Sequence, residues 1–131
     1  MRITADTNVL VRALVQDDPE QARAATAALQ QAESIAVPLP VLCELVWVLR
    51  RVYGFSAADC GAAIETLIAS RSVRVDRPAV ELGLRLLAAG GDFADGVIAM
   101  AGCALGAERL VTFDQQAATL LQQCGQAVDV L

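Results

Sequence analysis

The sequence predicts an α/β fold in which helices cover both faces of a central parallel sheet. Short apolar segments of strand composition alternate with longer helical patterns along the whole chain. This alternation is typical of parallel sheets, whose crossover connections are helices. The chain has 131 residues, which is enough for one compact domain to bury its own core. We therefore expect a single α/β domain over residues 1–131.

The expected strands are short and apolar, and the expected helices fill the segments between them. The strands are expected over residues 2–5, 34–37, 72–75, 109–113 and 127–131. The helices are expected over residues 7–14, 17–33, 38–53, 57–70, 78–90, 93–106 and 115–123.

Capping residues and prolines mark where several of these helices begin. Thr7 and Asn8 suit the N-terminus of the first helix, and Ser56 suits that of the fourth, because their side-chain oxygens accept hydrogen bonds from unpaired backbone N–H groups. Pro19 and Pro78 suit the first turns of the second and fifth helices, where a missing N–H breaks no helical hydrogen bond.

The residue types that the chain lacks restrict its chemistry. It contains no histidine, and all ten of its basic residues are arginine. Serine or cysteine nucleophiles activated by histidine are therefore excluded, as are phosphate-binding and Schiff-base lysines. An enzyme of this composition must rely on carboxylates and on a metal that they bind. Hard oxygen ligands favour Mg²⁺ or Mn²⁺.

The net charge limits which molecules the protein can bind, and its hydropathy indicates where in the cell it is found. The net charge of −5 argues against a general nucleic-acid binder, which would carry a basic face, but it leaves a nuclease possible because a bound cation reverses the local charge of an acidic site. The longest apolar stretches, such as residues 97–107, are shorter than the ~20 residues of a membrane helix. The first residues do not resemble a signal peptide. We expect a cytoplasmic protein without membrane segments.

Asp6 and Asp114 each follow a predicted strand directly. If both strands run parallel in one sheet, both carboxylates lie at the sheet edge where ligands bind in such folds. Helix capping is the alternative role for either residue, because aspartate also suits the N-terminus of the helix that follows.

Glu44 is the only charged residue between Ile35 and Leu49. The surrounding leucines and valines repeat at helical spacing, so we expect Glu44 to be largely surrounded by apolar side chains. A buried carboxylate needs a cation, which makes Glu44 a candidate metal ligand. Two alternatives stay open, a structural ion pair with an arginine such as Arg2 or Arg12, and a position on the one exposed edge of the helix.

Asp92 and Asp95 lie at the start of an otherwise apolar helix. Their spacing of three residues allows them to share one helix face. Capping and interaction with the helix dipole can explain Asp92, whereas Asp95 follows the expected cap. Together with Asp6, Glu44 and Asp114 they form a set of acids that would repel one another without a shared cation. Such a site can bind one or two Mg²⁺ ions and hydrolyse a phosphodiester.

Four segments of the chain resemble the acidic motifs of PIN domains. They are Asp6-Thr7-Asn8-Val9-Leu10, Pro40-Val41-Leu42-Cys43-Glu44-Leu45, Asp92-Phe93-Ala94-Asp95-Gly96-Val97-Ile98-Ala99 and Leu110-Val111-Thr112-Phe113-Asp114. Their order and spacing fit the family over essentially the whole chain. The last motif differs from the usual pattern in having Phe113 before the aspartate and Gln115-Gln116-Ala117 after it.

In size and form the chain is most similar to VapC-type toxins of bacterial toxin–antitoxin pairs. The resemblance implies a three-layer α/β/α sandwich around about five parallel strands, and an endoribonuclease that depends on Mg²⁺ or Mn²⁺. It places the catalytic and metal-binding acids at Asp6, Glu44, Asp95 and Asp114, with Asp92 as a further metal ligand. Thr7, Asn8 and Thr112 would be polar neighbours that support these acids by hydrogen bonds.

The resemblance also implies partners. RNA would be the substrate, a small VapB-like antitoxin the inhibitor, and a homodimer the typical assembly. Arg12, Arg50 and Arg51 are candidate RNA contacts, although cations at Arg50 and Arg51 also suit the C-terminus of their helix. Two other functions remain open, a PIN nuclease for RNA processing or DNA flaps, and a catalytically silent PIN-like scaffold that only binds a partner.

Overall fold

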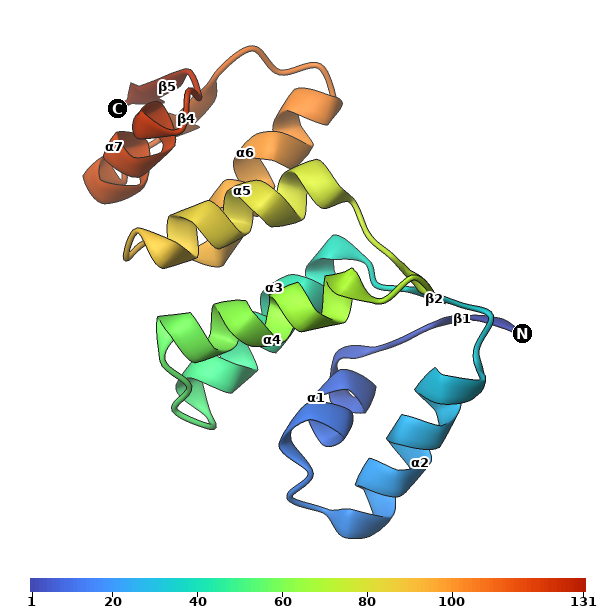
Figure 1. The fold of residues 1–131 in the computed structure, drawn as a ribbon. Coiled ribbons are helices and arrows are strands. Elements are labelled where there is room, and N and C mark those ends of the chain that lie inside the picture. The colour runs from blue at the N-terminus through green and yellow to red at the C-terminus, as the bar shows by residue number, and fades with distance from the viewer. The chain divides into compact units, whose positions relative to one another are not determined.

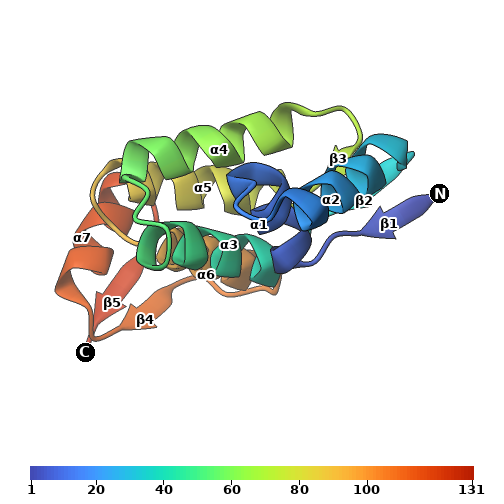
Figure 2. The same ribbon diagram turned by 90° about the horizontal axis from the view of Figure 1, so that it is seen from below.

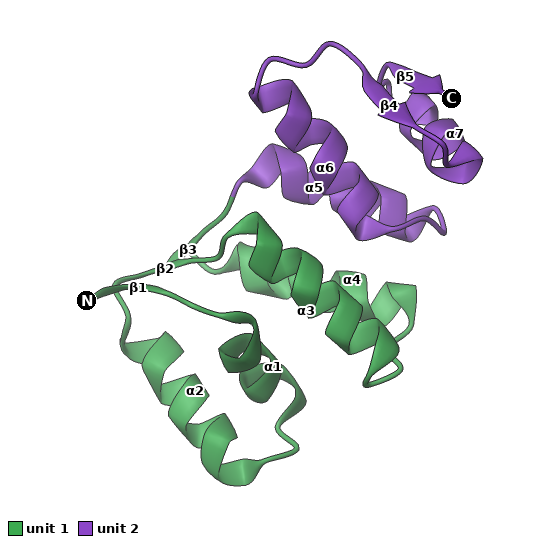
Figure 3. Ribbon diagram, turned by 180° about the vertical axis from the view of Figure 1, so that it is seen from behind, with its two compact units in different colours: residues 1–75 green, residues 76–131 purple.

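The computed structural model describes all residues from Met1 to Leu131. It shows an α/β protein in which every strand pairing is parallel (Figure 1), so the predicted fold class is confirmed. The chain divides into two compact units, unit 1 from Met1 to Val75 and unit 2 from Asp76 to Leu131 (Figure 3). The single domain over residues 1–131 stays a prediction.

Unit 1 contains three strands and four helices, in the order that the sequence predicts. Its strands are β1 (Arg2–Thr4), β2 (Ser34–Ala36) and β3 (Val73–Arg74). Its helices are α1 (Thr7–Val15), α2 (Pro19–Gln31), α3 (Leu39–Arg51) and α4 (Ala57–Ala69).

The sheet of unit 1 has the strand order β1-β2-β3. Ile3 is paired with Ile35, and Ile35 with Val73, so these three side chains lie in one row on one face of the sheet. Ile35 and Val73 are buried, whereas Thr4 and Arg74, in the neighbouring row, are exposed. Helix α1 packs on both α2 and α3, α3 packs on α4, and α4 packs on β3. The apolar row and these helices therefore form the core of unit 1.

Helix α3 has one buried face and one exposed face. Its buried side chains recur at helical spacing, as the sequence predicts: Leu42, Leu45, Val46 and Leu49. The residues between them on the other side include Pro40, Glu44, Trp47 and Arg51, and all four are exposed. Apolar composition alone therefore does not bury this helix, because a periodicity of about 3.6 residues leaves one side facing outward.

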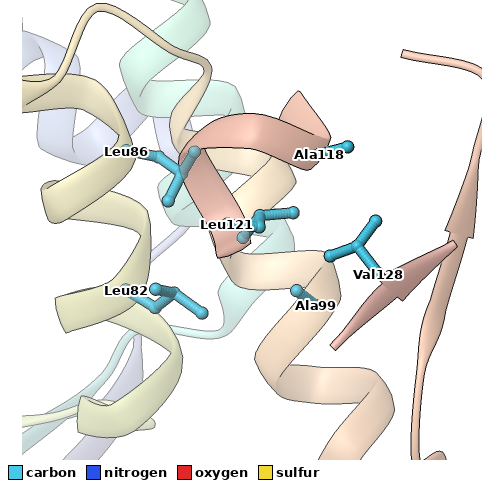
Figure 4. Close-up of a cluster of buried hydrophobic side chains, with 6 residues drawn as sticks. All are labelled: Leu82, Leu86, Ala99, Ala118, Leu121 and Val128. Carbon is cyan, nitrogen blue, oxygen red and sulfur yellow. The ribbon is translucent and has the colours of Figure 1, made fainter. Parts of the chain in front are cut away.

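Unit 2 contains the helices α5 (Arg77–Ala88), α6 (Phe93–Ala104) and α7 (Gln115–Gln123) and the strands β4 (Leu110–Thr112) and β5 (Val128–Val130). The two strands form a parallel pair (Figure 2). The core of the unit joins all three helices to β5 (Figure 4), through Leu82, Leu86, Ala99, Ala118, Leu121 and Val128.

Helices α5 and α6 approach each other closely at two glycines. A Cβ atom on Gly96 would lie 2.6 Å from the carbonyl oxygen of Leu82 and 2.7 Å from the Cα of Gly83. A Cβ atom on Gly83 would lie 2.8 Å from the ring of Phe93. Both contacts are shorter than carbon atoms tolerate, so only glycine allows this backbone packing. Gly96 directly follows Asp95, and this packing therefore fixes the first turn of α6.

The structure corrects several details of the sequence prediction. The strands are two or three residues long, shorter than expected, and they are hydrogen-bonded as a three-stranded and a two-stranded sheet rather than as one sheet of five. Asp6, and not Thr7 or Asn8, is the N-cap of α1, because Asp6 keeps an extended backbone while Thr7 is already helical. None of the helices combines the length and the apolar character that a membrane crossing requires.

The glycine packing of α5 and α6 predicts a sharp difference between two substitutions in α6. Gly96→Ala is expected to destabilise the protein by about 1–3 kcal/mol, because the added methyl group meets backbone atoms that cannot move aside. Gly102→Ala is the matched control, since its Cβ would lie 3.9 Å from the nearest atom, on Ala107, and alanine favours a helix by about 0.5–1 kcal/mol. Urea unfolding of both variants measures the difference, and equal midpoints would contradict the packing.

Candidate active site

The two candidate acids of unit 1, Asp6 and Glu44, both lie near the start of α1. Asp6 lies just beyond β1, where the backbone N–H of Ala5 still donates to the carbonyl of Ala36 at 3.1 Å. The carboxylate of Asp6 accepts a hydrogen bond from the backbone N–H of Val9 at 3.0 Å, through Oδ1. Capping thus occupies one oxygen of Asp6, and the residue is exposed. The capping role and a ligand role are therefore compatible in one side chain.

Glu44 is joined to α1 by a hydrogen bond. The hydroxyl of Thr7 donates to Oε1 of Glu44 at 3.1 Å, across 37 positions of sequence. This bond brings the first and second acidic motifs together within unit 1. Thr7 is thus a polar neighbour of Glu44, the kind of role that the family resemblance implies for it.

The expectation that apolar side chains surround Glu44 is wrong. Glu44 is exposed, because at about 100° per residue it lies roughly 150° around α3 from the centre of the buried stripe. Of the two alternatives, the structure agrees with a position of Glu44 on the exposed edge of the helix. It does not agree with an ion pair between Glu44 and Arg12, because Arg12 is paired with Asp17 instead. Exposure leaves the Glu44 carboxylate accessible to a cation and to a substrate.

Arg12 belongs to a network that sequence reasoning missed. Its Nη1 donates to Oδ1 of Asp17 at 2.8 Å and to the Tyr53 hydroxyl at 3.5 Å, and that hydroxyl donates to Oδ2 of Asp17 at 3.0 Å. The hydrogen bond from Tyr53 lowers the pKa of Asp17, and the hydrogen bond from Arg12 lowers it further by a smaller amount. The network ties α1 to the residues that follow α3. In the sequence, Tyr53 is noticeable only as the one tyrosine of the chain, next to Gly54.

A cavity of about 380 Å³ lies beside Asp6, between α1 and α2. Its lining residues are Asp6, Asn8, Val9, Arg12, Gln21, Ala24, Ala25 and Ala28. Three alanines of α2 contribute to its wall, together with polar residues of both helices. Asn8, expected to support the acids, therefore lies in the cavity wall beside Asp6.

The three candidate acids of unit 2, Asp92, Asp95 and Asp114, lie at the beginnings of α6 and α7. Oδ1 of Asp92 accepts from the backbone N–H of Ala94, and Oδ1 of Asp114 accepts from that of Ala117, each at 3.0 Å. The hydroxyl of Thr112 accepts from the backbone N–H of Asp114 at 3.0 Å. Asp92 is the N-cap of α6 and Asp114 is the N-cap of α7, which is the alternative role that the sequence allowed for both. Thr112 supports the turn that presents Asp114.

Asp95 lies in the electrostatic field of Asp92 and Asp114, the other two candidate acids of unit 2. It lies in the first turn of α6 and is partly buried. Burial raises the pKa of Asp95, and the negative charges of Asp92 and Asp114 raise it further. The three acids therefore share one electrostatic environment within the unit. Such mutual repulsion is what a bound cation relieves.

The donor set fits a hard divalent cation. The candidate ligands are carboxylate oxygens, with hydroxyls beside them, and no thiolate or imidazole takes part. Neither unit by itself gathers three metal-ligating side chains. Mg²⁺ does not require such a cage, because it keeps several waters and commonly binds one or two carboxylates together with substrate phosphates.

The raised pKa of Asp95 predicts a pH-dependent effect of Asp95→Asn. A raised folded pKa contributes stability below the unfolded carboxyl pKa of about 3.9, and this contribution is lost as the pH rises through the folded pKa. In metal-free buffer at neutral pH, Asp95→Asn is therefore expected to raise the melting temperature by a few degrees. The gain should shrink as the pH falls toward the carboxyl range.

Thermal unfolding over a pH series measures this effect. Glu81→Gln is the control, since Glu81 is an exposed acid on α5 of the same unit, and its substitution should change the melting temperature little at any pH. A lower melting temperature of Asp95→Asn at neutral pH would contradict the electrostatic interpretation.

Comparison with known proteins agrees with the motif analysis. No curated protein matches the chain. The family model of the PIN domain matches residues 3–120, which include all five candidate acids. PIN domains are generally nucleases that use divalent metals such as Mg²⁺. Since the match covers most of the sequence, the chain belongs to the PIN domain family.

Proposed function

We propose that this protein is an endoribonuclease that depends on Mg²⁺ or Mn²⁺ and serves as the toxin of a type II toxin–antitoxin pair. The observation that carries the proposal is the hydrogen bond from Thr7 to Glu44. It joins two acidic motifs that are far apart in sequence and holds Glu44 beside the start of α1, where Asp6 lies. Both acids are exposed, as residues that meet a nucleic acid must be.

The acids that would hold the metal are Asp6, Glu44, Asp92, Asp95 and Asp114. When bound, the metal supplies positive charge for the phosphodiester and lowers the pKa of the attacking water. The protein's own contribution is orientation. Capping hydrogen bonds fix one oxygen each of Asp6, Asp92 and Asp114, and the Thr7 hydroxyl fixes Glu44. Side chains held in this way lose little entropy when they engage a ligand.

The toxin role, the antitoxin and the dimer rest on the similarity to VapC-type toxins. A small VapB-like protein would inhibit the enzyme in the cytoplasm. Exposed apolar residues such as Phe113, 79% exposed, and Leu131, 68% exposed, support the idea of a protein partner. Toxicity tests this part directly: expression should arrest bacterial growth, and a small gene adjacent to its own should restore it. Growth without arrest would favour a PIN nuclease of RNA processing instead.

Cleavage of RNA tests the catalytic acids. Purified protein with Mn²⁺ is expected to cleave a panel of structured RNAs, and Asp6→Ala and Glu44→Ala should each lower the rate at least about 100-fold, the usual scale for losing a group that stabilises transition-state charge. Glu65→Ala and Glu81→Ala are matched controls, because both residues are exposed acids outside the motifs. They should keep full activity.

Two results would separate the alternatives. Cleavage that survives both Asp6→Ala and Glu44→Ala would mean that the site is wrong. A Mn²⁺-induced rise in melting temperature that disappears in Asp6→Asn, without cleavage of any RNA, would favour DNA flaps as substrate or a silent scaffold. Gel analysis of RNA and of flap DNA with the same samples distinguishes these outcomes.

A further inference from the structure

The exposed face of α3 carries an aromatic residue next to Glu44. Trp47 is 60% exposed, although the helix buries four smaller apolar side chains on its other face. Residues three and four positions apart in a helix are neighbours, with Cβ atoms about 5–6 Å apart. Trp47 therefore lies between Glu44, three positions before it, and Arg51, four positions after it, and all three are exposed.

We propose that Trp47 is a stacking platform for an unpaired base of the RNA substrate, and that Arg51 contacts the phosphate backbone beside it. This inference rests on the proposed ribonuclease function and specifies the substrate as a single-stranded segment. The base that stacks on Trp47 would position the chain of nucleotides along α3 toward Glu44. Trp47 would thus be a substrate-positioning residue rather than a catalytic one.

The exposure of Trp47 is the first argument. Tryptophan offers the largest apolar surface of any side chain, and leaving that surface in water forgoes most of the stabilisation that burial provides. The buried positions of α3 hold leucine and valine instead, so Trp47 contributes little to the core of unit 1. An aromatic ring placed outward, within a helical turn of a candidate metal ligand, suits contact with a ligand.

The charges beside Trp47 also suit a nucleic acid. Arg50 and Arg51 end α3 and are both exposed, so the exposed face carries Glu44, then Trp47, then these two arginines. Single-stranded nucleic acids are bound by this combination, since bases stack on aromatic rings while arginines contact phosphates. A duplex keeps its bases stacked on one another and cannot offer a free base face. The face therefore favours unpaired RNA over a duplex.

Trp47 is the only tryptophan of the chain, so fluorescence excited where tryptophan but not tyrosine absorbs reports on it alone. The titration uses the full-length protein with Ca²⁺ in place of Mn²⁺, and three RNA probes of equal length: an oligouridylate, an abasic ribose–phosphate oligomer and an RNA duplex. Stacking should quench the emission with the oligouridylate. The abasic oligomer and the duplex should quench it far less, because neither offers a free base.

Variants at position 47 test the chemistry of the platform by anisotropy of a labelled oligouridylate. Trp47→Ala and Trp47→Leu should each weaken binding about 5- to 100-fold, the range for losing one base–aromatic stack, while Trp47→Phe should keep most of the affinity. Val52→Ala is the matched control, since Val52 is 62% exposed but lies on another side of the helix end. Arg51→Gln should reduce the slope of log affinity against log salt by about one.

The outcomes distinguish this inference from the proposed function. Mn²⁺-dependent cleavage that needs Asp6, combined with unchanged Trp47 emission, would overturn the stacking inference and leave the ribonuclease standing. Quenching by the oligouridylate without any cleavage would support the stacking site and count against the nuclease. Equal binding by Trp47→Leu and the wild type would overturn the inference. Emission from free protein that acrylamide cannot quench would overturn it too, because it would mean that protein covers Trp47.

Discussion

The helix caps of Asp6, Asp92 and Asp114 are the interactions on which the acidic sites depend. Each carboxylate accepts a backbone N–H at 3.0 Å through one oxygen, and such a cap contributes about 0.5–2 kcal/mol to the helix that it begins. The same bond fixes the direction of the second oxygen. A residue that stabilises the fold therefore also presents a charge in a defined place, and the helix dipole favours that charge.

This arrangement also causes repulsion between carboxylates, and the repulsion is strongest around Asp95 in unit 2. Burial raises the pKa of Asp95, and the negative charges of the two capping residues Asp92 and Asp114 raise it further. The contact between α5 and α6 at Gly83 and Gly96 leaves the first turn of α6 little freedom to move away. Packing thus holds like charges near one another that would otherwise separate, and carboxylates perturbed in this way cluster at functional sites.

Local patterns predicted most of the fold. The order of helices and strands and the parallel pairing followed from alternating composition, caps and prolines, because these signals act over a few residues. The length of the strands did not, since hydrogen bonds between distant segments decide where a strand ends. Glu44 shows the same limit within the site. Its apolar neighbours in sequence suggested burial, but the packing of α3 on one side alone left it exposed.

The sequence by itself determined which side chains can perform the chemistry. The absence of histidine and lysine left carboxylates as the candidate catalytic groups, and the places of Asp6, Asp92 and Asp114 at helix starts follow from local capping preferences. Only the tertiary structure decided how those groups are supported. The bond from Thr7 to Glu44 and the network of Arg12, Asp17 and Tyr53 each depend on how α1 and α3 pack together. Contacts across tens of residues depend on that packing, and no local pattern encodes it.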